Sequence, residues 1–185
     1  METNSVEYVF DVVSTQLPKA GVEFLMIGGH AVNHYGFSRA TVDVDFMIVS
    51  NDVATVREVM KTAGFTNVSD SDNVIFFGHP ENPHRVDFLK IEQDSMDKLI
   101  KSAEVIDYSG YRLKVPGISD LIAMKLFAVS QGSLQREEKD LLDVVNLVQE
   151  CGLDLKLIRE LCDRYASDDV YSKVESRMSG EEKDG

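Results

Sequence analysis

Two aspartates alternate with apolar residues in the segment TVDVDFMIV. A β-strand sends residues i and i+2 to the same face, so Asp43 and Asp45 are expected to lie side by side. The alternating apolar residues are then expected to face a core; these are Val42, Val44 and Phe46. Adjacent carboxylates repel each other unless a cation lies between them, and such hard oxygen ligands suit Mg²⁺ or Mn²⁺. The pair therefore predicts a divalent-metal site.

Two consecutive glycines precede the aspartates, at the end of another short apolar run, FLMIGG. Gly28 and Gly29 have no side chains, so their backbone N–H groups can approach a ligand closely. A brief helix is predicted directly after them, and N–H groups at the start of a helix favour phosphate. An ordinary tight turn between strand and helix would also use glycine here, but the nearby aspartates favour contact with a phosphate.

A third aspartate, Asp87, lies in the apolar run RVDFL, which indicates a buried strand. On a strand of the same sheet it could complete a set of three carboxylates with Asp43 and Asp45. The alternative is a surface ion pair with Arg85 or Lys90. We expect the set of three carboxylates, because the residues around Asp87 are those of a buried strand.

Two polar residues between the glycines and the aspartates could contact a nucleotide. Arg39 and Thr41 precede Asp43 in a segment that must turn from helix into strand. Arg39 could bind a phosphate or pair with an acid at the surface, and the sequence leaves both alternatives open. We include Arg39 and Thr41 among the candidate nucleotide-binding residues.

Lys125 is a charged residue within the apolar stripe of a predicted helix. A lysine there must extend to solvent, form an internal ion pair with an acid, or bind an anionic ligand. We favour contact with a phosphate. For the charged residues that follow we favour a solvated helix face with salt bridges; these are Arg136, Lys139, Asp140 and Asp143.

The four histidines form two pairs by spacing. His30 and His34 lie four residues apart on one predicted helical face, and His79 and His84 flank a predicted turn. Neither pair is accompanied by a metal-binding motif such as H-E-x-x-H. We interpret all four as core or surface histidines, although His30 could alternatively face the nucleotide.

The acidic composition narrows the range of partners. Nineteen Lys and Arg residues against 32 Asp and Glu residues give a formal net charge of −13. This charge argues against a broad nucleic-acid surface, which normally requires basic residues to displace counterions from phosphates. A small nucleotide that brings its own Mg²⁺ is easier to accommodate, and a polynucleotide acceptor is disfavoured.

The composition and the N-terminus predict a cytoplasmic protein. An apolar fraction of 43% and a charged fraction of 28% are ordinary for a soluble protein. No apolar run approaches the ~18 residues of a membrane span, and the N-terminus lacks the features of a signal peptide. We therefore expect no contact with a membrane. Cys151 and Cys162 have no nearby zinc ligands, so we expect them to be reduced structural thiols.

The elements that would position these residues alternate between helix and strand in the first part of the chain. Helices are predicted near residues 6–17, 30–35, 53–63 and 95–102. Strands are predicted near residues 23–28 and 42–49, then at 74–77 and 85–91 with the loop GHPENPH between them, and on both sides of 108–111. From residue 118 to about 178 the pattern is helical.

This order predicts an α+β fold with a mixed β-sheet flanked by helices and a C-terminal helical extension. The change in pattern near Pro116 and Gly117 is the candidate boundary. We predict a core over residues 1–117, a helical extension packed on it over 118–178, and a flexible tail over 179–185.

The glycines and aspartates also form a longer motif. It reads G-G, thirteen residues, D-V-D, and then a third aspartate in R-V-D-F-L. This pattern resembles the nucleotidyltransferase superfamily that shares the DNA polymerase β-like core. The stretch IGGHAVNHYGFSRATVDVDFMIV is most similar to the small bacterial branch that includes AbiEii-type toxins. The resemblance covers residues 23–91 and, more loosely, 118–148.

The resemblance implies roles for individual residues. Gly28 and Gly29 would contact the nucleotide phosphates, and Asp43 and Asp45 would hold the metals. Asp87 would complete the site and deprotonate the acceptor. The resembling families also carry a lysine in a segment similar to DLIAMKL, followed by a stretch of the form R-x-x-K-D-x-x-D.

We therefore expect an Mg²⁺- or Mn²⁺-dependent nucleotidyltransferase that moves a nucleoside monophosphate from an NTP to a hydroxyl group. Three carboxylates on neighbouring strands would suit two metal ions, which position and neutralise the triphosphate. The acceptor could be a small molecule, a protein side chain or an RNA end. The alternatives are a non-catalytic nucleotide- or partner-binding module, and a toxin with an antitoxin partner. AbiEii-type toxins usually carry a longer helical portion than this chain.

Overall fold

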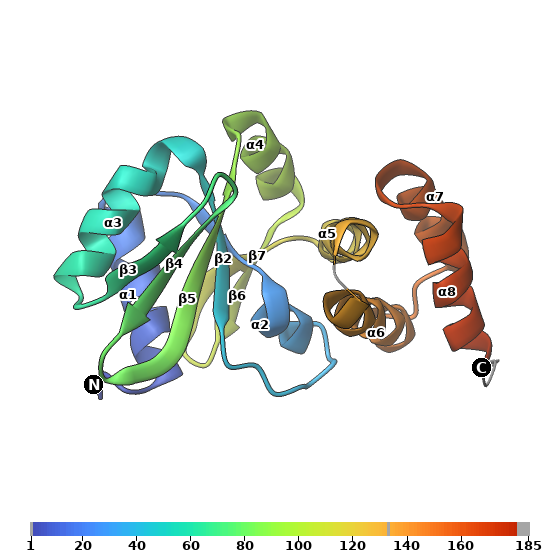
Figure 1. Cartoon of the computed structure of the whole chain (residues 1–185), viewed down its shortest axis with the longest axis horizontal. Coiled ribbons are helices and arrows are strands. Elements are labelled where there is room, and N and C mark those ends of the chain that lie inside the picture. Colours follow the sequence, from blue (N-terminus) through green and yellow to red (C-terminus); the bar gives the residue numbers. More distant parts are fainter. Residues whose placement is uncertain (1, 133, 181–185) are drawn as a thin grey trace. The chain divides into compact units, whose positions relative to one another are not determined.

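The computed structural model describes residues 2–132 and 134–180 (Figure 1). Contacts within the chain divide it into two compact units. Unit 1 comprises Met1–Ala31 and Arg39–Gly117, and unit 2 comprises Val32–Ser38 and Ile118–Gly185. The three candidate aspartates and both glycines therefore belong to unit 1, whereas Lys125 belongs to unit 2.

Unit 1 is built on a five-stranded sheet with the strand order β1-β2-β5-β4-β3. The strands are β1 (Phe24–Met26), β2 (Val44–Val49), β3 (Thr66–Asp70), β4 (Val74–His79) and β5 (Asn82–Ile91). β2 and β5 run parallel, and all other neighbours in the sheet are antiparallel. Parallel neighbours cannot be joined by a tight hairpin, so the chain leaves the sheet after β2 and returns through β3 and β4.

Helices accompany this mixed sheet, as the sequence predicted. They are α1 (Val6–Lys19), α2 (Gly28–His34), α3 (Val53–Thr62) and α4 (Gln93–Ser102), and the short 3₁₀ helix η1 (Ser50–Asp52) precedes α3. α1 and α3 contact each other and lie along one face of the sheet (Figure 1). Ser5 caps α1 by accepting a hydrogen bond from the backbone N–H of Tyr8 at 3.3 Å. The predicted α+β class is confirmed.

The face of the sheet that packs on helices has an aromatic centre. Phe46 on β2 stacks on Phe88 of β5 with the ring centroids 5.5 Å apart, and Phe77 on β4 meets Phe88 edge to face at 5.8 Å. All three rings are buried. Since side chains alternate across a strand, the residues next to these phenylalanines face the other side. Asp45 and Asp87 consequently lie on the opposite face of the sheet.

A separate hairpin follows α4. It consists of β6 (Glu104–Tyr108) and β7 (Tyr111–Val115), which pair in an antiparallel manner. The two residues of the turn, Ser109 and Gly110, both have positive φ angles, of 54° and 83°. This backbone matches the twist of paired strands, and it explains why a glycine is present. The strand pair predicted around this turn is confirmed.

Two strand predictions need correction. β4 and β5 extend into the segment GHPENPH, which the sequence predicted as a loop, and only Pro80 and Glu81 form the turn. β3 was not predicted, because all five of its residues are exposed and its sequence TNVSD lacks apolar alternation. Backbone pairing with β4 is what places this segment in the sheet.

Unit 2 is helical after Gly117. Its helices are α5 (Ile118–Gln131), α6 (Leu134–Glu150), α7 (Leu155–Tyr165) and α8 (Asp168–Ser179). Asp154 and Ser167 cap α7 and α8 through their side-chain oxygens, and Gly152 has a φ of 60° in the turn before α7. The predicted helical pattern is confirmed. Residues 181–185 of the predicted tail lie outside the described residues, and the predicted domain limits stay a prediction.

Both cysteines lie in unit 2 as free thiols. Cys162 is buried, and burial raises the pKa of its thiol to about 11. A thiol with so high a pKa remains protonated at neutral pH, which fits the predicted structural role. Among the described helices, none has both the length and the apolar character needed to cross a bilayer.

Candidate active site

Two carboxylates meet where β2 and β5 run side by side. In the parallel register Asp45 lies directly opposite Asp87, next to the pair formed by Val44 and Val86. Directly opposed residues of parallel strands point to the same face of the sheet. The fold therefore brings these two predicted site residues together on the face away from the aromatic core.

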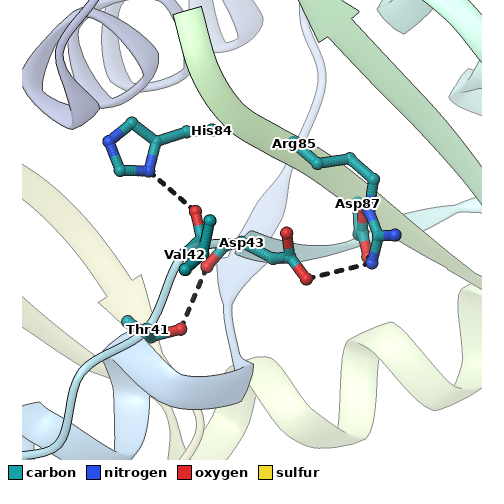
Figure 2. Close-up of polar contacts among 6 residues, drawn as sticks. All are labelled: Thr41, Val42, Asp43, His84, Arg85 and Asp87. Carbon is teal, nitrogen blue, oxygen red and sulfur yellow. Dashed lines mark hydrogen bonds and ion pairs between the residues drawn. The ribbon is translucent and has the colours of Figure 1, made fainter.

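Asp43 lies one residue before β2, at a bend, and not within the strand as predicted. The prediction that Val42 faces the core is wrong, because the strand begins only at Val44 and Val42 is 64% exposed. One hydrogen bond forms within this segment and a second connects it to β5 (Figure 2). Thr41 Oγ1 donates to the backbone oxygen of Asp43 at 3.2 Å, and His84 Nδ1 donates to the backbone oxygen of Val42 at 2.7 Å.

The guanidinium group of Arg85 connects Asp43 with Asp87 (Figure 2). Its Nη2 atom lies 3.0 Å from Asp43 Oδ2 and 2.8 Å from Asp87 Oδ2, and its Nε atom lies 2.7 Å from Asp87 Oδ1. Asp87 therefore forms the ion pair with Arg85 that the sequence left as an alternative. It also lies near the other two aspartates, as the predicted set of three carboxylates requires. Lys90 has a different partner, Asp70, at 2.6 Å.

Electrostatic effects at Asp87 oppose each other. Burial raises the pKa of Asp87 above its ordinary value, and the negative charges of Asp45 and Asp43 add to this rise. Hydrogen bonds and the positive charge of Arg85 lower the pKa, but the net direction is upward. The hydrogen bond to Asp87 in turn raises the pKa of Arg85. The arginine thus offsets only part of the cost of placing three carboxylates together.

Gly28 is required where it contacts the first of these carboxylates. Its φ is 64°, and a Cβ atom at this position would lie 2.0 Å from Asp45 Oδ2 and 2.5 Å from Asp45 Cγ. Real Cβ atoms do not approach other atoms so closely, so any side chain would displace the carboxylate. The sequence explained Gly28 by a close approach of phosphate, whereas the structure gives a reason within the protein itself.

Gly29 lies in a similarly crowded position. A Cβ atom there would lie 2.6 Å from Thr41 Oγ1 and 3.1 Å from Nη1 of Arg39. Arg39 and Thr41 are therefore next to the glycine pair, as expected of residues from one binding site. The contact of these four residues with a nucleotide stays a prediction.

The residues present fit a divalent metal in their chemistry. Carboxylate oxygens are the ligands that Mg²⁺ and Mn²⁺ prefer, and the site brings three carboxylates together. Within residues 2–132 and 134–180, however, no group of three His, Cys, Asp or Glu side chains is arranged so that it could hold a metal ion. The carboxylates of Asp43 and Asp87 both turn toward Arg85.

Lys125 has carboxylate partners within unit 2. Its Nζ atom lies 2.6 Å from Asp140 Oδ1 and 2.8 Å from Asp143 Oδ2. This is the internal ion pair that the sequence left open, and a contact between Lys125 and phosphate stays a prediction. The prediction that Asp140 and Asp143 belong to a solvated face is wrong, because both side chains are buried against Lys125. The side chain of Arg136 lies outside the described residues.

His30 is buried and follows the glycine pair on α2. Its Nδ1 atom is 3.1 Å from the hydroxyl of Tyr108, and its ring meets Phe10 edge to face. Nε2 of His30 is buried with no hydrogen-bond partner. Burial lowers the pKa of His30 to about 4, and the positive charges of His84 and Arg39 contribute to the decrease. The imidazole is therefore neutral at pH 7.

Two residues of this site had weak signals in the sequence. Arg85 was considered only as a surface partner of Asp87, although the spacing R-x-D on a strand already places both on one face. His84 was assigned to a turn, and its bond to Val42 depends on β5 reaching further back than predicted. The apolar pattern begins at Val86, so it could not indicate the earlier residues of β5.

The sequence matches one protein-family model over residues 14–175. The family is described as nucleotidyl transferase AbiEii toxin, type IV TA system. No curated protein matches the sequence significantly.

Several solved structures share the fold at low sequence identity. The solution structure of the antibiotic-resistance factor ANT(2'')-Ia has a TM-score of 0.66 at 10% identity and covers 97% of this chain and 100% of that chain. Lincomycin-bound LnuA, a lincosamide antibiotic adenylyltransferase, has a TM-score of 0.57 at 15% identity, with coverage of 78% and 96%. A nucleotidyltransferase-like protein from Paracoccidioides brasiliensis has a TM-score of 0.55 at 17% identity, with coverage of 93% and 94%.

Replacing Gly28 by alanine should destabilise the protein more than the same change at Gly21. Both glycines have positive φ, but a Cβ atom at Gly21 would meet nothing within 4 Å. Gly21→Ala should cost about 1–2 kcal/mol from backbone strain alone, and Gly28→Ala about 2–5 kcal/mol because it also clashes with Asp45. Urea unfolding measures both. Equal losses of stability would contradict the close packing of Gly28 on the carboxylate.

The depressed pKa of His30 predicts a loss of stability in mild acid. The unfolded chain binds a proton near pH 6.5 and the folded chain only near pH 4, so the free energy of unfolding decreases as the pH falls through this interval. Between pH 7 and pH 5 the contribution of His30 is about 2 kcal/mol. His30→Gln should remove this part of the pH dependence, and the control His34→Gln should retain it. Urea unfolding at both pH values checks this, and an unchanged slope in His30→Gln would contradict the assignment.

Proposed function

Because this chain belongs to the AbiEii family of nucleotidyl transferases, we propose that it moves a nucleoside monophosphate from a nucleoside triphosphate to a hydroxyl group and releases pyrophosphate, with Mg²⁺ or Mn²⁺ as cofactor. The observation that carries this proposal is the in-register pairing of Asp45 with Asp87 on parallel strands, with Asp43 beside them. The acceptor is a small molecule, a protein side chain or an RNA end.

The three aspartates are the residues that would hold the metal ions. Bound metal would neutralise the triphosphate and stabilise the attacking and leaving oxygens. Asp45 and Asp87 contribute rigidity, because each is fixed by the backbone pairing of its strand. Asp43 is positioned by its own backbone, through the hydrogen bond from Thr41. The backbone of this cradle is therefore fixed before a nucleotide binds.

The glycine pair and Arg39 are the proposed contacts for the triphosphate. Gly28 and Gly29 present backbone without side chains directly beside Asp45 and Thr41. The guanidinium of Arg39 lies next to Gly29, where its charge would favour a phosphate group. A triphosphate bound beside the glycine pair would therefore be near both the guanidinium of Arg39 and the carboxylate of Asp45.

Asp87 is the proposed acceptor of the proton from the attacking hydroxyl group. A carboxylate becomes a stronger base as its pKa rises, and burial raises the pKa of Asp87. Asp45 and Asp43 add to this increase in the protein without metal. Asp43 and Asp45 serve as ligands, whereas Asp87 serves as ligand and base.

Replacing Asp45 by asparagine should abolish nucleotidyl transfer while the fold is retained. The amide keeps the shape of the side chain but loses the negative charge that binds a metal ion. Purified protein is incubated with each α-³²P-labelled NTP and Mg²⁺, together with bulk tRNA, a protein mixture or a mixture of small alcohols. Transfer of label should fall by about a hundredfold or more in Asp45→Asn. Asp72→Asn, at an exposed loop residue, is the matched control.

Nucleotide binding provides the outcome that would contradict the proposal. Binding of the labelled NTP should require the divalent ion and should be lost in Asp45→Asn. Binding that is equally tight in EDTA and in the variant would mean that the three aspartates do not form the site.

A non-catalytic nucleotide- or partner-binding module is the second candidate. The contacts of Arg85 with Asp43 and Asp87 favour it, because they satisfy these carboxylates without a metal ion. A module of this kind would be stabilised against melting by a nucleotide, yet it would release no pyrophosphate with any acceptor. The transfer assay above distinguishes the two candidates.

The protein is also proposed to act as a toxin that has a cognate antitoxin, since the family description names a toxin of a type IV system. Expression of the chain in bacteria should arrest growth, and Asp43→Asn should relieve the arrest because it removes a metal ligand. Growth curves at matched protein levels test this. Arrest that persists unchanged in Asp43→Asn would separate toxicity from nucleotidyl transfer.

A further inference from the structure

We propose that Arg85 is an internal counterion of the three aspartates, which competes with the divalent metal and must leave Asp43 and Asp87 before the metal can bind. The inference rests on the proposed function, because it assumes that these aspartates are the metal site. It adds a positioning residue that adjusts metal affinity.

The geometry places the guanidinium between carboxylates that a metal ion would have to share. Arg85 contacts Asp43 once and Asp87 twice, at 2.7 to 3.0 Å. A cation at this distance holds both carboxylates in orientations directed at itself. In these orientations Asp43 Oδ2 and both carboxylate oxygens of Asp87 are occupied by the guanidinium group. The metal and the arginine therefore require the same oxygens.

The arginine is also placed so that it can leave. Its side chain is 47% exposed, whereas that of Asp87 is 11% exposed. The guanidinium carbon lies 4.8 Å from the ring centroid of Phe76, which is the neighbour of Asp87 on β4. A cation over an aromatic ring keeps a favourable contact when its carboxylate partners are withdrawn. Arg85 can therefore turn away from the aspartates without losing its contact with the sheet.

Competition of this kind has opposite effects on the metal-free protein and on the metal-bound protein. Without metal, Arg85 relieves the repulsion among the three aspartates and so stabilises the fold. With metal, the same contacts must be broken, so they lower the apparent affinity for the ion. Removing the guanidinium should consequently weaken the metal-free protein and tighten the binding of metal.

The test is the binding of Mn²⁺ alone to the full chain, measured by isothermal titration calorimetry. Arg85→Gln should bind Mn²⁺ about fivefold to tenfold more tightly than the wild type, because the competing charge is gone. Arg85→Lys should fall between the two, since an ammonium group keeps the charge but cannot span both carboxylates. Arg57→Gln is the matched control, because Arg57 pairs with Asp70 and not with the aspartates of the site.

A second readout is the melting temperature in EDTA and in Mn²⁺. In EDTA, Arg85→Gln should melt below the wild type, and Mn²⁺ should raise its melting temperature by more than it raises that of the wild type. Arg57→Gln should show the same rise with Mn²⁺ as the wild type. Neither readout depends on catalysis or on the unknown acceptor.

The outcomes separate this inference from the proposed function. Equal or weaker binding of Mn²⁺ by Arg85→Gln, with binding lost in Asp45→Asn, would overturn the competition and leave the metal site in place. If neither the wild type nor Arg85→Gln bound Mn²⁺, both the competition and the proposed metal dependence would be overturned.

Discussion

Like charges on one face of a sheet are the constraint on which unit 1 depends. The parallel pairing of β2 with β5 fixes Asp45 opposite Asp87, and the bend before β2 adds Asp43. Such a cluster is unstable without a positive charge nearby. The protein supplies that charge from Arg85, two residues before Asp87 on the same strand. The carboxylates can thus be held in place before any ligand arrives.

The same two strands provide apolar packing, which offsets the repulsion among the three aspartates. Phe46 and Phe88 follow Asp45 and Asp87 directly in the chain and stack on each other on the opposite face. Burying two such rings stabilises the fold by several kcal/mol, on the order of 1.5–3 kcal/mol for each. A slip of the register by one residue would exchange the two faces, with charges in the core and rings at the site. Core and site therefore specify one register together.

The main parts of the fold and of the candidate site could be predicted from local patterns. Helical spacing predicted α1, and the alternation of apolar residues with Asp45 and Asp87 predicted two strands with acidic faces. The exposed strand β3 could not be predicted, because it is defined by its pairing with β4 and not by its own composition. The contacts of Arg85 and Lys125 depended on which carboxylates the fold brings near, and sequence spacing alone does not determine this.

The ion pairs of Lys125 have a consequence for movement within unit 2. Asp140 and Asp143 lie three residues apart on α6 and hold one ammonium group of α5 between them, with all three side chains buried. Sliding α5 by one turn, about 5.4 Å, would leave buried charges unpaired, at a cost of about 3–5 kcal/mol. α5 and α6 are thereby locked in one register, so a rearrangement of unit 2 has to carry the two helices as a single rigid piece.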